Sequence, residues 1–281
     1  MIWLWLALGL VLLALGLFLY WAFIITEGAY LGSRTVALTY DLTARRYDGI
    51  KQFNPFDDAR FLAMPMIDAL HDVERPLVLD VATGTGRMVQ ALLDRPSFDG
   101  TVIGLDLSYR MLQQAEAKLH DYAGRHTLIW CDAQHLPFPD DTFDAVSCLE
   151  ALEFMPSSRR VLVEIARVLR PGGAFLVTNR INWERHVMPG KAFTDPQLRA
   201  LFLQAHLVNA KIRPWQVYYD LIWAHKTGSQ SRLGRGMHEL PQVLRCPCCM
   251  HSPLHGDPGH VLCPPCGLQC PIHDHICSIP S

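Results

Sequence analysis

The chain has 281 residues, half of them hydrophobic, and a formal net charge of -2. This length can form one sizeable α/β domain with small attachments at either end. A chain so close to neutral has no general positive field with which to hold a polyanion, so nucleic acid is not the expected partner.

The first element is an apolar segment at residues 1–26. Its first 25 residues include no charged side chain, and as a helix it is long enough to cross a bilayer. We expect a single transmembrane anchor. The alternative is a cleaved signal peptide, but no positive residue precedes the segment and no clear small-x-small cleavage site follows it. Arg34, Arg45 and Arg46 all follow the segment, which predicts that the rest of the chain faces the cytoplasm.

Between about residues 57 and 205, short β-rich runs alternate with helical stretches, which predicts βαβ units and a mainly parallel sheet. The expected strands are 77–81, 101–106, 127–131, 143–149 and 174–179, and the expected helices are 111–122, 158–169 and 196–205. We expect Pro171-Gly172-Gly173 to stop the second of these helices. Two further runs, at 209–214 and 216–225, would form an antiparallel hairpin. The domain, residues 27–226, is therefore predicted to be a Rossmann-like α/β domain of seven strands.

A glycine-containing turn follows the first expected strand. The strand ends near Asp80, and Ala82, Gly84 and Gly86 then let the backbone pass close to a ligand. Such a loop also occurs in dinucleotide sites, so it does not identify the ligand alone. Asp106 ends the second strand about 20 residues further on, where a carboxylate can accept hydrogen bonds from both ribose hydroxyls.

The end of the third expected strand adds a candidate adenine site. Asp132 is placed to accept a hydrogen bond from the adenine amino group, and Leu107 and Ala133 would flank the ring. Together with the glycine turn and Asp106, this pattern favours an adenosine ligand with an unphosphorylated ribose.

Four motifs, in this order and spacing, resemble the class I S-adenosylmethionine-dependent methyltransferases, the broad group that includes the ubiquinone and menaquinone biosynthesis enzymes. The motifs are 78–86, 104–108, 132–138 and 167–173. The resemblance covers about residues 40–226, and residues 40–48 resemble the segment that covers the cofactor in that group. It implies S-adenosylmethionine as cofactor. The residues expected to bind it are Asp80, Ala82, Thr83, Gly84, Gly86, Asp106, Leu107, Asp132 and Ala133.

Two departures from the family pattern concern the site. The first glycine of the loop is Ala82 here, a small change that should leave cofactor binding intact. The histidine pair often found after the fourth strand is replaced by Glu153-Phe154, so the acceptor side is left open. In-line methyl transfer makes a dedicated base optional. The candidate members of the acceptor pocket, each of which also fits an ordinary surface or packing role, are Tyr47, Glu153, Arg180 and His186.

The C-terminal region has a different composition. Residues 227–243 are rich in Gly, Ser and Arg and are expected to form a linker. Seven of the nine cysteines then lie within residues 246–277, and two CxxC pairs stand thirteen residues apart. This spacing predicts a structural zinc ribbon in residues 244–281. The expected ligands are Cys246, Cys249, Cys263 and Cys266, with Cys248, Cys270, Cys277 and five nearby histidines as alternatives and an oxidised or metal-free tail as the competing interpretation.

The module resembles small zinc ribbons that are attached to methyltransferases or partner them, including enzymes that act on RNA or translation factors. We therefore consider three functions. The first is membrane-anchored methylation of a small molecule such as a quinone precursor or lipid, because the anchor would hold the site near the bilayer. The second is methylation of RNA or protein docked through the ribbon. The third is a non-catalytic scaffold, which the intact loop and Asp106 disfavour. The sequence leaves the methyl acceptor and the oligomeric state open.

Overall fold

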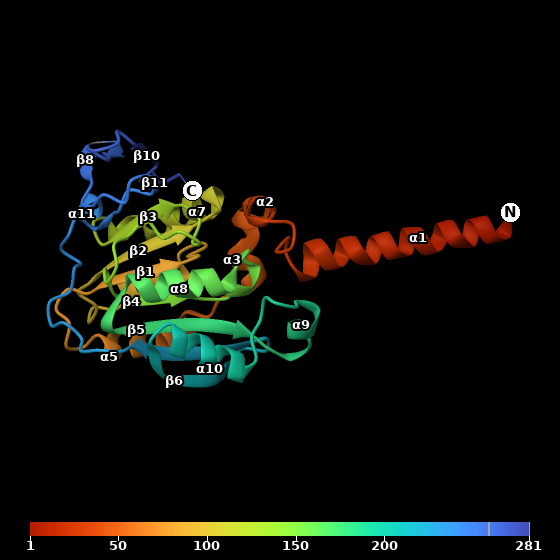
Figure 1. Ribbon diagram of the computed structural model, residues 1–281, viewed down its shortest axis with the longest axis horizontal. Coiled ribbons are helices and arrows are strands. Elements are labelled where there is room, and N and C mark those ends of the chain that lie inside the picture. Colours follow the sequence, from red (N-terminus) through yellow and green to blue (C-terminus); the bar gives the residue numbers. More distant parts are fainter. Residues whose placement is uncertain (258, 281) are drawn as a thin grey trace.

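The computed structural model describes residues 1–257 and 259–280. Its strands are β1 (Leu77–Val81), β2 (Thr101–Asp106), β3 (His126–Trp130), β4 (Phe143–Cys148), β5 (Leu169–Arg180), β6 (Leu207–Trp215), β7 (Tyr219–Lys226), β8 (His255–Asp257), β9 (His260–Leu262), β10 (Gln269–His273) and β11 (Ile276–Ser278). They form one sheet in the order β6-β7-β5-β4-β1-β2-β3-β11-β10-β9-β8 (Figure 1).

The α-helices are α1 (Ile2–Tyr20), α2 (Ser33–Thr43), α3 (Tyr47–Lys51), α4 (Pro55–Asp58), α5 (Met64–Ala69), α6 (Arg87–Leu93), α7 (Tyr109–Leu119), α8 (Ser158–Val168), α9 (Asn182–Val187), α10 (Asp195–Gln204) and α11 (Leu240–Val243). α1 projects away from the sheet, and other helices cover both of its faces (Figure 1). Most buried side chains of α8 and α10 belong to one hydrophobic cluster, and most of those of α5, α6 and α7 belong to another. The sheet is therefore the middle layer of three.

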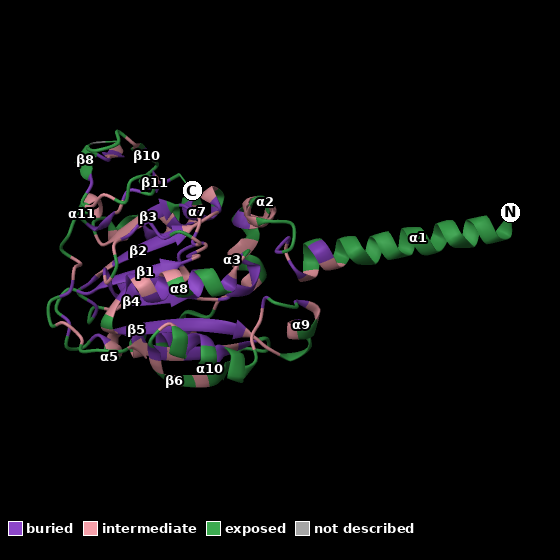
Figure 2. Cartoon of the chain, in the orientation of Figure 1, coloured by how far each residue is buried: buried purple, intermediate pink, exposed green. Residues whose placement is uncertain are grey.

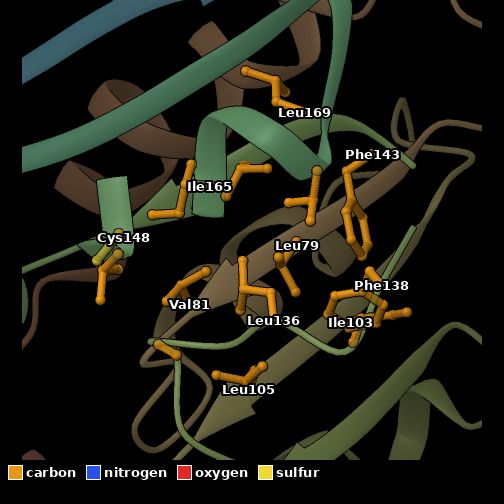
Figure 3. Packing of buried hydrophobic residues seen from close by; sticks show 14 of the residues in the cluster. Leu79, Val81, Ile103, Leu105, Leu136, Phe138, Phe143, Cys148, Ile165 and Leu169 are labelled. Carbon is orange, nitrogen blue, oxygen red and sulfur yellow. The ribbon is translucent and has the colours of Figure 1, made fainter. Parts of the chain in front are cut away.

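The central strand β1 shows how the sequence builds these layers. β1 pairs in parallel with β2 and β4, and all five of its residues are buried. Because successive side chains of a strand point to opposite faces, Leu79 and Val81 pack in the cluster that includes Ile165 of α8 (Figure 3). Val78 lies in the other cluster, with Leu92 of α6. An apolar strand buried on both faces is typical of a parallel α/β sheet.

The predicted seven-stranded Rossmann-like domain is confirmed by β1 to β7, and the predicted hairpin is formed by β6 and β7 at the edge of the sheet. The expected role of Pro171-Gly172-Gly173 was wrong in its position. α8 already ends at Val168, and the three residues lie inside β5. They form a bulge, because Leu169 pairs with Phe143 and the pairing with β4 resumes only at Ala174, opposite Ala145.

The C-terminal module continues the sheet. β11 pairs in parallel with β3, with Cys277 opposite Ile129, and β10, β9 and β8 follow. The connecting segment, residues 227–243, passes the residues that precede β1, where the Gly234 amide donates to the Glu74 carbonyl over 2.9 Å. Cys277 and Ile279 are buried within the main hydrophobic cluster. The module therefore shares both a sheet and a core with the domain.

The N-terminal helix is joined quite differently. Residues Ile2–Ile25 form a 24-residue apolar helix with a mean hydropathy of 2.6, and its most apolar window is entirely exposed (Figure 2). By length and composition it can cross a membrane, a test that a signal sequence also passes. Among the described residues, it touches the domain through its last turn, where Ala22 is buried and the Trp21 Nε1–H donates to the Val187 carbonyl over 2.9 Å.

Candidate active site

A cavity lies at the carboxyl ends of β1, β2, β3 and β4, which is where open α/β sheets bind ligands. Its floor is formed by the loops that follow these strands, and its cover is α2. An adjoining smaller cavity continues along the loop after β1. The lining residues that were predicted from the sequence are Asp80, Ala82, Thr83, Gly84, Asp106, Leu107, Asp132, Ala133 and Tyr47.

The loop after β1 has the backbone that its glycines predict. Gly84 and Gly86 have φ values of +55° and +81°, and Ala82 also has a positive φ of +56°. A residue with a Cβ costs about 1–2 kcal/mol in this region, so Ala82 is the strained member. Gly86 lies outside the cavity lining, and a Cβ there would come within 3.0 Å of a Leu119 methyl group on α7. Its glycine is explained by packing as well as by its backbone conformation.

Asp106 connects the glycine loop to the floor of the cavity. Its Oδ2 accepts from the Gly84 amide and its Oδ1 accepts from the Ser108 amide, both over 2.8 Å. Burial raises the pKa of Asp106 to about 6 although these amides oppose the shift. A carboxylate has about four lone-pair sites, so Asp106 keeps acceptor capacity for a ligand in the cavity.

The other two predicted carboxylates, Asp80 and Asp132, form hydrogen bonds that stabilise the floor. Asp80 is buried and accepts from the Thr83 and Ser147 hydroxyls over 2.7 Å each. Burial raises the pKa of Asp80 to about 6, and both hydroxyls act against this shift. Asp132 accepts from the backbone amide and the side-chain amide of Gln134 over 2.9 and 3.1 Å. It shapes the turn in which Ala133 lines the cavity.

The N-terminal segment of the domain is fastened over this floor. Asp41 of α2 accepts from the Ser108 hydroxyl over 2.5 Å and from the Arg110 amide over 3.1 Å. Asp48 of α3 accepts from the Thr85 hydroxyl over 2.5 Å and pairs with Lys118. These bonds hold residues 40–48 across the cavity, where the family resemblance had led us to expect a cover.

A second, charged group of residues borders the cavity. Arg87, the residue after Gly86, pairs with Asp58 over 2.6 Å and with Glu150 over 2.7 Å, and Lys51 also reaches Glu150. The guanidinium lies 4.2 Å from the centroid of the Phe53 ring. Burial alone would raise the pKa of Glu150, but Lys51 and Arg87 lower it below its usual value. Glu150 is thus an ionised carboxylate in the cavity wall.

Sequence reasoning missed Arg87 and Glu150. A signal for each was present, because Arg87 opens the helix after the glycine loop and Glu150 is the second residue after β4, at the ligand-binding edge of the sheet. Their pairing connects positions 63 residues apart, and no local pattern reveals such a contact.

The four proposed acceptor-side residues take different places. Tyr47 lines the cavity, and burial raises its pKa far above the usual value, which keeps the phenol protonated. Glu153 is buried beside the cavity and accepts from the Tyr219 hydroxyl over 2.7 Å and from Arg180 over 3.1 Å. His186 is exposed on α9 and is not among the residues that line the cavity. Their catalytic roles stay predictions.

The four predicted cysteine ligands come together at the start of the C-terminal module. Their Sγ atoms all lie within 4.8 Å of one another, with 3.5 Å between Cys246 and Cys266 and 3.4 Å between Cys249 and Cys263. These separations exceed the roughly 2.05 Å of a disulfide. Tetrahedral zinc with bonds of about 2.3 Å to sulfur would set neighbouring sulfurs about 3.8 Å apart. The four thiols therefore suit a zinc ion with little adjustment.

Comparison with known proteins agrees with this geometry. Residues 79–177 match the family model described as a methyltransferase domain. The chain is 33% identical over 194 residues to the ubiquinone/menaquinone biosynthesis C-methyltransferase UbiE of Hahella chejuensis, covering 68% of this chain and 77% of that protein. It is 45% identical over 95 residues to the demethylmenaquinone methyltransferase of Bacillus licheniformis, covering 34% of this chain and 40% of that protein.

The match to the first four curated relatives spans between 39% and 57% of their length.

Among solved structures, the fold is similar to a chain from the complex between the Haloferax volcanii Trm112 methyltransferase activator and a methyltransferase. The TM-score is 0.51 and the sequence identity 24%, with 67% of this chain and 97% of that chain covered. At this identity the likeness concerns the fold alone.

Proposed function

The chain belongs to the class I S-adenosylmethionine-dependent methyltransferases, and from this premise we propose that it methylates a small, lipid-soluble acceptor while anchored in a membrane by α1. The observation that carries the proposal is the cavity under α2, which has the glycine loop and Asp106 on one side and Tyr40, Phe154 and Met155 on another. One cavity thus offers polar groups for a cofactor and apolar walls for an acceptor.

The residues on the floor fit an adenosine-containing cofactor. Asp106 would accept hydrogen bonds from the ribose hydroxyls and Asp132 would accept one from the adenine amino group, with Leu107 and Ala133 beside the ring. Gly84 has a positive φ, and no atom lies within 4 Å of the place that a Cβ would occupy. Because it has no side chain, its backbone can approach the ligand closely. When bound, S-adenosylmethionine supplies an activated methyl group on a sulfonium.

The other walls of the cavity would hold the acceptor. In-line displacement depends mainly on placing the attacking atom behind the methyl group. Tyr47 remains a hydrogen-bond donor because its phenol stays protonated, whereas Glu150 remains an acceptor because Lys51 and Arg87 keep it ionised. A donor and an acceptor in one wall can orient a hydroxylated ring.

The apolar part of the cavity favours a small acceptor. Tyr40 and Phe154 lie with their ring centroids 6.2 Å apart, and Met155 follows them in the wall. The relatives from Hahella chejuensis and Bacillus licheniformis are named as ubiquinone/menaquinone biosynthesis and demethylmenaquinone methyltransferases. A quinone precursor or a related lipid-soluble ring is therefore the acceptor class that we propose.

The two attachments have separate roles in this proposal. α1 would span the membrane once and keep the cavity near acceptors dissolved in the bilayer, with the domain on the cytoplasmic side, where Arg34, Arg45 and Arg46 lie. A zinc ion held by the four clustered thiols would be structural, because four protein ligands leave no open position for chemistry. It would stabilise the module whose strand β11 pairs with β3.

Calorimetric titration of the full chain with S-adenosylmethionine and its demethylated product tests the cofactor assignment. Asp106→Ala should weaken binding by about tenfold or more, since hydrogen bonds to a charged group contribute roughly 1.5–3 kcal/mol. Asp121→Ala, a substitution of a carboxylate that is 79% exposed, is the matched control and should bind normally. Absence of binding by the unmodified chain, or equal binding by both variants, would contradict the assignment.

A further inference from the structure

We propose that the end of the domain from which α1 emerges is itself a membrane-binding surface, which rests on an anionic phospholipid bilayer and admits the acceptor from it. This inference rests on the proposed membrane anchor and goes beyond it, because it assigns a second lipid contact to the folded domain.

Three segments that are distant in sequence meet at this end. The Tyr30 hydroxyl, in the approach to α2, donates to the Pro189 carbonyl just after α9 over 2.8 Å. The Asn182 side chain at the start of α9 donates to the Val217 carbonyl, in the β6–β7 turn, over 2.6 Å. Trp21, in the last turn of the apolar helix, is bonded to the same α9 segment. Figure 1 shows α2 and α9 on the side from which α1 projects.

These segments expose large apolar side chains, which we call the anchor-side patch: Leu38, Leu42, Trp183, Val217 and Tyr218. Leu38 and Leu42 stand one turn apart on α2 and are 59% and 76% exposed, and Trp183 on α9 is 54% exposed. Single exposed apolar residues are ordinary. Five exposed apolar residues on neighbouring segments, next to the base of an exposed apolar helix, indicate that this surface contacts an apolar partner.

The charges around the patch identify that partner. Arg34, Arg45 and Arg46 are exposed on α2 and directly after it. The acidic residues of the same stretch are engaged within the domain, Asp41 with Ser108 and Asp48 with Lys118. Basic residues among exposed leucines, with Trp and Tyr at the boundary, are the pattern of a surface that lies in the headgroup layer. The occupant is therefore a lipid bilayer with anionic headgroups.

The patch and the cavity share α2. Leu38 and Leu42 are exposed, whereas Ala37 and Tyr40 of the same helix line the cavity. The facing wall includes Met155, whose carbonyl is fixed by the buried Lys191 ammonium over 2.6 Å. A lipid-soluble acceptor that reaches the boundary between α2 and this wall would thus pass from the bilayer into the cavity with little exposure to water.

Photocrosslinking of the full chain tests this surface. p-Benzoylphenylalanine is placed singly at position 42, 183, 12 or 203, and the protein is reconstituted into vesicles of phosphatidylcholine and phosphatidylglycerol. Leu12 lies within α1 and is the positive control; Leu203 is 72% exposed on α10 and is the matched negative control. After irradiation, lipid adducts are quantified by mass spectrometry. We expect adducts at 42 and 183 in about fivefold excess over 203, because only the first two would lie in the interface.

The four positions separate this inference from the proposed anchor. Adducts at 12 with none above the level of 203 at positions 42 and 183 would overturn the membrane-binding surface and leave the anchor intact. No adduct at 12 would overturn the anchor and this inference together. Equal adducts at 203 and 42 would show unselective contact and would also overturn it. Unchanged thermal unfolding midpoints show that each variant is folded.

Discussion

The two attachments of the methyltransferase domain are joined to it in opposite ways. The apolar window of α1 is entirely exposed within the described residues, and the helix touches the domain only through its last turn. The four-cysteine module instead adds β11 to the edge of β3 and buries Cys270, Cys277 and Ile279 in the main core. An attachment that supplies a strand takes part in folding, whereas one that contacts the domain through a single turn contributes little to it.

Hydrogen bonds also connect the module to the floor of the cavity. The Ile279 amide donates to the Trp130 carbonyl over 3.0 Å, and the Trp130 Nε1–H donates to the Leu107 carbonyl over 2.8 Å. Leu107 lines the cavity. The comparison therefore extends from stability to binding: we expect loss of the module to disturb the cofactor site and loss of α1 to leave it intact.

The largest effect is expected from removing a thiol of the four-cysteine cluster. Cys263→Ser should abolish zinc binding and lower the free energy of unfolding of the whole domain by at least about 3 kcal/mol, because a bound zinc ion would stabilise the module and the module covers β3. Metal analysis and denaturant unfolding measure both quantities. The control is Cys248→Ser, a change of an exposed cysteine outside the cluster. If zinc is lost while the domain unfolds as before, the two parts fold independently.

Cofactor affinity should depend on pH in the same way with or without α1. The folded-state pKa of Asp106 is raised by burial to about 6, so the carboxylate is ionised above this pH and loses an acceptor oxygen below it. We expect binding to be about tenfold weaker at pH 5 than at pH 8, the ratio of ionised forms for this pKa. Asp106→Asn should bind weakly with a flatter profile. A steep profile in that variant would assign the titration to another group, such as Asp80.

A smaller effect should follow from breaking the path between the module and the cavity. Trp130→Phe removes the hydrogen bond to the Leu107 carbonyl and should weaken S-adenosylmethionine binding by about two- to tenfold, the value of one such bond. Trp183→Phe, at an exposed position on α9, serves as the control and should leave the dissociation constant unchanged. Normal affinity in Trp130→Phe would mean that the module acts on stability alone.

Deleting residues 1–20 should have the smallest effect on the domain. The free energy of unfolding is expected to change by less than about 0.5 kcal/mol, because these residues bury nothing in the domain. Vesicle flotation should show much weaker membrane association for the shortened chain, with the anchor-side patch as the remaining contact. A large loss of stability would show that α1 belongs to the fold and would end the contrast with the module.

Sequence reasoning identified the parts of the fold that depend on local spacing. The loop from Asp80 to Gly86 and the strand ending at Asp106 could be predicted because a short turn and a strand end have their own residue patterns. The pairing of β11 with β3 could not, since it joins Cys277 to Ile129 through a three-residue strand. The Arg87–Glu150 pair was hidden for the same reason, because such contacts arise only when the sheet has assembled.

Transfer of labelled methyl groups tests the account most directly. The full chain, reconstituted in vesicles, is incubated with methyl-labelled S-adenosylmethionine, a total lipid extract and total RNA from its source, and the products are separated into organic-soluble, RNA and protein fractions. The account predicts label in the organic-soluble small molecules, and its loss in Asp106→Ala. Label confined to RNA or protein, or equal labelling by Asp106→Ala, would contradict it.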